Sequence, residues 1–78
     1  MADRKPVQAC YRLFGAKIEQ MRTVLGLTQE DIATRTGLTH TSIANIEAGR
    51  QRILMHDIEI FANAFSTTPK NILRGIWT

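Results

Sequence analysis

An all-α fold of five helices, in one compact domain, is what the sequence predicts. Apolar residues recur at steps of three and four positions along most of the 78 residues, which is the period of a helix face. Residues that cap helices stand before several of these stretches. No segment shows the alternation of β-branched residues that marks a strand. A chain of this length supports one core, so we expect a single domain over residues 1–78.

The composition narrows the classes of protein that the chain can belong to. It has 44% hydrophobic residues and a formal net charge of +3, and the positive charge favours a polyanionic partner only weakly. No apolar run approaches the roughly 20 residues of a membrane span, and no secretory signal is evident after Met1. Cys10 is the only cysteine, which permits no internal disulfide and suits a reducing cytoplasm. We therefore expect a cytoplasmic protein without a membrane segment.

The first helix is predicted from an apolar stripe that ends before Gly26. The stripe comprises Val7, Cys10, Tyr11, Phe14, Ile18, Met21 and Leu25. Residues at this spacing lie on one side of a helix and face a core, so we interpret Cys10 as a small buried hydrophobic residue. Glycine directly after such a stripe is a common helix stop.

Two short helices follow, and their first residues are arranged in nearly the same way. The segments are Leu27-Thr28-Gln29-Glu30-Asp31-Ile32 and Leu38-Thr39-His40-Thr41-Ser42-Ile43. In each, the threonine can cap the helix, and the flanking leucine and isoleucine can pack as a hydrophobic staple. Gly37 and Gly49 close the two helices. A turn as short as residues 36–39 makes the helices cross steeply, so a helix-turn-helix is predicted over about 28–48.

Two further helices are predicted after a basic stretch, Arg50-Gln51-Arg52. The fourth carries Met55, Ile58, Phe61, Ala62 and Phe65 at helical spacing. Thr68-Pro69 supplies a cap and a proline at the first helical position, which opens a short fifth helix. The apolar face of this last helix comprises Ile72, Leu73 and Ile76 and runs up to Trp77.

The third helix has an unusual outward face. At 100° per residue, Ile43 and Ile46 lie on one side, and small or neutral residues centre on the other. These residues are Thr41, Ala44, Asn45 and Ala48, flanked by His40 and Ser42. Small side chains allow a helix to enter the major groove of DNA, and imidazole, hydroxyl and amide groups can bond base edges. The alternative is a polar surface without a partner.

The helix-turn-helix residues resemble a known family. The residues that carry the resemblance are Gly26-Leu27-Thr28-Gln29-Glu30-Asp31-Ile32-Ala33, Gly37-Leu38-Thr39 and Ser42-Ile43-Ala44-Asn45-Ile46-Glu47-Ala48-Gly49-Arg50. They resemble the lambda-repressor-like family of phage Cro and repressor proteins, whose members of similar size include the controller proteins of restriction-modification systems. The resemblance spans all five helices and implies a compact five-helix DNA-binding domain that binds operators as a homodimer. The chain departs from the family in its short arm, residues 2–5, and in His40.

DNA-contacting residues are predicted on the second and third helices and on the loop that follows them. His40, Thr41 and Asn45 are the expected base-reading residues, because the first turns of the third helix enter the groove. The expected phosphate contacts are Gln29, Ser42, Arg50 and Arg52. Gln29 is assigned mainly on the resemblance, and its position at a helix start favours phosphate. For Asn45 the alternative is a contact with a phosphate, and for the four phosphate-contact residues it is an ordinary solvated side chain.

Arg22 and Glu47 require a different interpretation, because each stands on or beside an apolar stripe. A charge in that position needs a partner. The resemblance implies that the two side chains meet and lock the first helix to the end of the third. The alternative is that either side chain reaches water.

No enzyme is predicted. His40, His56 and Cys10 do not have the spacing of metal ligands, and no glycine-rich phosphate loop or pair of catalytic carboxylates is present. We therefore expect no catalytic residue, no metal and no cofactor.

The homodimer interface is expected on the fifth helix, at Ile72, Leu73, Ile76 and Trp77, since the first four helices already supply a core. The alternative is that Trp77 folds back onto its own domain.

The predicted function is that of a sequence-specific transcription regulator on a pseudo-palindromic operator, of the restriction-modification controller type. Its partners are double-stranded DNA, a second copy of the chain and, at a promoter, RNA polymerase. Two rivals remain at this stage. One is an antitoxin that represses its own operon and also binds a toxin. The other is a helix-turn-helix fold used only for protein interaction.

Overall fold

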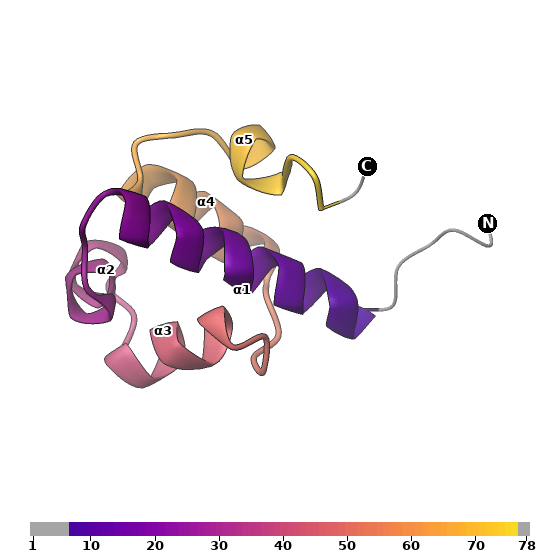
Figure 1. Ribbon diagram of the computed structural model, residues 1–78, viewed down its shortest axis with the longest axis horizontal. Coiled ribbons are helices and arrows are strands. Elements are labelled where there is room, and N and C mark those ends of the chain that lie inside the picture. The colour runs from indigo at the N-terminus through magenta and orange to yellow at the C-terminus, as the bar shows by residue number, and fades with distance from the viewer. Residues whose placement is uncertain (1–6, 77–78) are drawn as a thin grey trace.

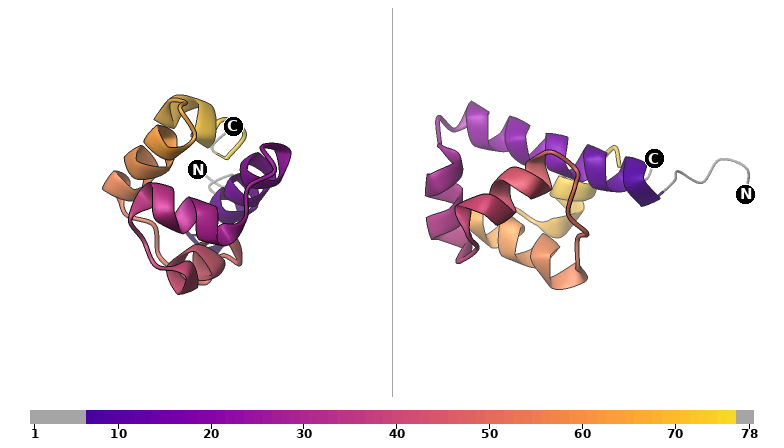
Figure 2. Two further views of the ribbon diagram at one scale, coloured as in Figure 1. Left: turned by 90° about the vertical axis from the view of Figure 1, so that its left-hand side faces the viewer. Right: turned by 90° about the horizontal axis from the view of Figure 1, so that it is seen from below.

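The computed structural model describes residues 7–76, which form five helices (Figure 1). They are α1 (Val7–Val24), α2 (Gln29–Thr36), α3 (His40–Glu47), α4 (Met55–Ala64) and α5 (Pro69–Leu73). Viewed along the long axis, α1 and α4 lie on opposite sides, while α3 and α5 close the remaining two (Figure 2). The predicted all-α fold of five helices is confirmed for this part of the chain. None of the helices described there is long and apolar enough to span a membrane.

One hydrophobic core joins the five helices. Its buried residues are Phe14, Ile18, Ile32, Ala33, Ile43, Ile46, Phe61, Ala62, Phe65, Ile72 and Ile76. The rings of Phe14 and Phe61 meet edge to face, with centroids 5.8 Å apart. Burying one side chain of this size contributes about 1.5–3 kcal/mol, so the apolar stripes of α1 and α4 hold the short helices α2 and α3 in place. Cys10, expected to be buried, is half-buried.

Threonine side chains determine where three helices begin. The Oγ1 atoms of Thr28, Thr39 and Thr68 each accept a hydrogen bond from the backbone N–H three residues later, at 3.0, 3.0 and 3.1 Å. At the start of α2 the Asp31 carboxylate accepts from the backbone N–H of Thr28 at 2.9 Å, which completes a capping box. The predicted caps are therefore confirmed, and the first turn of α3 has a fixed position.

The capping box gives α2 a stability that depends on pH. The backbone and side-chain hydrogen bonds of Thr28 hold the pKa of Asp31 below its usual value. A depressed pKa stabilises the fold above the unfolded-state value, and this contribution is lost as the pH falls through the folded-state value. Asp31→Ala should thus lower the thermal midpoint at neutral pH, and the difference from wild type should shrink in acid. Circular dichroism melts across pH measure this effect. Glu30→Ala, in the same turn, should show a smaller acid dependence, and an equal one would contradict the prediction.

The predicted dimer interface on α5 is wrong for two of its four residues. Ile72 is 0% exposed and Ile76 is 3% exposed, so both belong to the core of their own domain and cannot form a dimer interface. Leu73 is half-buried and packs against the same core. The reason is that α5 packs against α1 and α4 and completes a core that four helices leave open. Trp77, the fourth expected interface residue, lies outside the described residues.

Candidate nucleic-acid interface

α3 presents the face that its sequence predicts. His40 and Thr41 are exposed and Asn45 is half-buried, whereas Ile43 and Ile46 are fully buried on the opposite side. The three predicted base-reading residues therefore share the solvent side of α3. His40 and Thr41 stand in its first turn, and Asn45 stands one turn further along.

A part-buried ion pair supports α3 from behind. Arg22 donates from Nε to Glu47 Oε2 at 2.6 Å and from Nη2 to Glu47 Oε1 at 3.0 Å, and the side chains are only 13% and 4% exposed. The third donor of Arg22, Nη1, bonds the carbonyl oxygen of Leu27 at 2.9 Å. The predicted Arg22–Glu47 pair is therefore present. It ties α1, the turn after it and the end of α3 into one rigid unit, and hydrogen bonding to Glu47 raises the pKa of Arg22.

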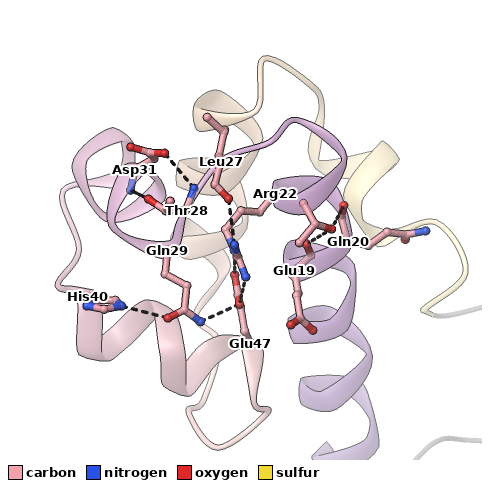
Figure 3. A network of polar contacts seen from close by, with 10 residues as sticks. Glu19, Gln20, Arg22, Leu27, Thr28, Gln29, Asp31, His40 and Glu47 are labelled. Carbon is pink, nitrogen blue, oxygen red and sulfur yellow. Dashed lines mark hydrogen bonds and ion pairs between the residues drawn. The ribbon is translucent and has the colours of Figure 1, made fainter.

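The ion pair extends through Gln29 to the first residue of α3 (Figure 3). Gln29 Nε2 donates to Glu47 Oε1 at 2.9 Å, and Gln29 Oε1 lies 3.0 Å from His40 Nε2. Because the amide nitrogen is directed at a carboxylate, the amide oxygen faces the imidazole, so His40 Nε2 is the donor in this pair. Sequence reasoning missed this link. The available signal was that Gln29 and His40 are the first residues of two matching helices.

Gln29 was predicted as a phosphate contact, and its side chain is half-buried. Its amide nitrogen carries two hydrogens, and the bond to Glu47 uses one of them. The other hydrogen can still be donated to a phosphate oxygen. The contact of Gln29 with phosphate stays a prediction. Ser42, also half-buried, has its backbone N–H bonded to the Thr39 cap, which places its side chain on the flank of the first turn of α3.

The loop after α3 begins with a tight turn and carries two cations. Gly49 has φ +76°, its N–H donates to the Ile46 carbonyl at 3.0 Å, and the Arg50 N–H donates to the Asn45 carbonyl at 2.9 Å. These two bonds form a Schellman motif, which needs a left-handed residue. Arg50 and Arg52 are both exposed in this loop, so the segment that directly follows α3 carries two positive charges.

The geometry suits a polyanion. A neutral hydrogen-bonding face is held rigidly, and cations stand at its end, which is how proteins divide base reading from backbone contacts. Within residues 7–76, no group of three or more His, Cys, Asp or Glu side chains could hold a metal ion.

The chain is similar to known regulators. A family model described as a helix-turn-helix domain matches residues 13–73. The chain is 34% identical over 62 residues to control protein C.BamHI of Bacillus amyloliquefaciens, covering 78% of this chain and 76% of that protein. It is 32% identical over 62 residues to the HTH-type transcriptional activator BcrR of Enterococcus faecalis, covering 80% of this chain but 30% of that protein. The restriction-modification controller protein C.AhdI from Aeromonas hydrophila has a similar structure, with a TM-score of 0.76 and 27% identity over 80% of this chain and 94% of that chain.

Proposed function

Because this chain belongs to the helix-turn-helix domain family whose model matches residues 13–73, we propose that it is a sequence-specific transcription regulator that binds a pseudo-palindromic operator as a homodimer. The observation that carries the proposal is the solvent face of α3, which holds His40, Thr41 and Asn45 on a helix that the Arg22–Glu47 ion pair supports. The similarity to C.BamHI and C.AhdI supports a regulator of the controller type. Regulation follows from occupancy, because a dimer bound at a promoter excludes RNA polymerase or contacts it.

The docking follows from the geometry of α3. The first turn enters the major groove, so His40 and Thr41 meet base edges first and Asn45 meets them one turn later. Gln29 and Ser42 contact phosphates near the start of the helix, and Arg50 and Arg52 contact them near its end. Use of this face for protein interaction alone is disfavoured, because such surfaces usually have large anchoring side chains. The exposed large hydrophobic residues of the described chain, Leu13, Val24, Leu25, Leu54 and Met55, all lie outside α3.

We assign the pairing surface to the start of α4. Met55 is 87% exposed and Leu54 is 47% exposed, beside an open groove of about 400 Å³ lined by Met55, His56, Ile58, Glu59, Pro69 and Leu73. A two-fold interface uses the same patch on both copies, and here Met55 of each copy can enter the groove of the other. Leu54 and Met55 lie outside α3, so pairing through them does not use the outward residues of α3.

Selection of bound duplexes from a random pool tests the function. A two-fold dimer should return a symmetric consensus with half-sites about 34 Å apart. Thr41→Ala and Asn45→Ala should each relax the consensus at specific positions, since a good base contact discriminates by about 1–3 kcal/mol. Thr34→Ala, at an exposed hydroxyl on α2, is the matched control and should leave the consensus unchanged. A pool without enrichment would refute DNA reading, and an unchanged consensus in both variants would refute the assigned face.

A further inference from the structure

We propose that Arg12 of α1 is a further contact to the DNA backbone, placed beside Arg50 by the packing of α1 on the end of α3. This inference rests on the proposed function, because it adds a ligand for phosphodiester groups to the same surface. It is carried by two close approaches between backbones and by the charges around them.

The first close approach is at Gly15. A Cβ atom built on Gly15 would lie 2.1 Å from the carbonyl oxygen of Ile46 and 2.8 Å from that of Glu47. Real Cβ atoms do not come this close to backbone atoms, so α1 packs directly on the last turn of α3 and only glycine fits there. The position of α1 relative to the end of α3 is therefore fixed by backbone contact.

The second close approach is one helical turn earlier on α1. A Cβ atom built on Gly49 would lie 2.7 Å from Cγ of Arg12 and 2.9 Å from its Cα. The stem of Arg12 therefore lies against the residue that precedes Arg50 in the chain. Arg12 is exposed, so its guanidinium group extends into solvent at the edge where the loop after α3 begins.

Among the described residues, 7–76, no carboxylate forms an ion pair with Arg12, Arg50 or Arg52. Arg12, Arg50 and Arg52 are all exposed, and the ion pairs found within residues 7–76 join Arg22 to Glu47 and His56 to Asp57 instead. Arg12 lies against Gly49, the residue before Arg50, and like charges brought close together in this way repel one another. Phosphodiester groups beside the groove relieve that repulsion and release their own counterions. The exposed cations that can contact phosphates are then Arg50 and Arg52 of the loop and Arg12 of α1.

A purely structural role for Arg12 is the rival, because a cation near the C-terminal end of α3 also interacts with the helix dipole. The test compares operator affinity and thermal midpoint across salt concentrations. Arg12→Ala should weaken binding to all duplexes alike and reduce the log–log salt slope by about 0.9. Its selected consensus and thermal midpoint should stay those of wild type. Arg12→Lys, which keeps the charge, should restore most of the slope.

Arg74→Ala is the matched control, since Arg74 is exposed and directly follows α5, the helix that lies on the side of the molecule opposite α3 (Figure 1). It should leave the salt slope unchanged. A wild-type slope in Arg12→Ala would overturn the inference, and so would an affinity loss that only follows a fall in thermal midpoint. Absence of salt-dependent DNA binding in wild type would instead refute the proposed function, so the two failures are distinguishable.

Discussion

Replacing Glu47 with glutamine should lower the free energy of unfolding by about 1.5–3 kcal/mol, the range for hydrogen bonds to a charged group. The Glu47 side chain is 4% exposed and accepts bonds from Arg22 Nε, Arg22 Nη2 and Gln29 Nε2. Glutamine keeps the shape but is neutral, so the half-buried Arg22 loses its carboxylate partner. Domains have about 0.05–0.15 kcal/mol of stability per residue, so the loss is a large share of the total. Urea unfolding followed by circular dichroism measures it.

Two variants make the Glu47 result interpretable. Glu19→Gln removes an exposed carboxylate of α1 that also acts on the Arg22 charge, and it should cost less than about 1 kcal/mol. Removing both charges, with Arg22→Met and Glu47→Leu, should recover part of the stability, because an apolar pair can replace a buried ion pair. A Glu47→Gln protein as stable as wild type would mean that the pair does not hold α1 to α3.

The helix boundaries were predictable because they depend on local chemistry. Thr28, Thr39 and Thr68 cap the backbone three residues ahead, and these contacts need no information about distant residues. The role of α5 was not predictable in the same way. Its apolar stripe shows that Ile72 and Ile76 must be covered but not by what. Only the packing of α5 on α1 and α4 decides that the cover comes from the same chain.

In the candidate site, too, some contacts could be predicted from the sequence and others depend on the packing of distant residues. The Arg22–Glu47 pair could be predicted, because two charges beside apolar stripes need partners and the family resemblance joined them. The link from Glu47 through Gln29 to His40 was missed, since an amide at a helix start fits solvent or phosphate equally well. Gly15 was missed for a different reason. A glycine inside a helix has no side chain to signal a contact. Only the structure shows that a Cβ atom at this position would clash with the Ile46 carbonyl oxygen, at 2.1 Å.

Met55→Asp should convert the proposed dimer into a monomer and reduce operator affinity by about 10²- to 10⁴-fold, the range by which linking two modules exceeds either one alone. Pairing across a two-fold axis would bring two aspartates together in an apolar groove, which like-charge repulsion and desolvation oppose. The monomer should nevertheless fold. Met55 is 87% exposed, and as the first residue of α4 it stands where an acidic side chain favours the helix dipole.

Sedimentation velocity and operator titration measure the two effects together. Val24→Asp adds the same charge at a side chain that is 79% exposed at the end of α1, so it controls for the repulsion between an added carboxylate and DNA. It should stay a dimer and lose far less affinity than Met55→Asp. A Met55→Asp protein that still sediments as a dimer would place the pairing surface elsewhere. A monomer that kept full affinity would show that one α3 and its flanking arginines suffice for the operator, and the two-fold mechanism would then be wrong.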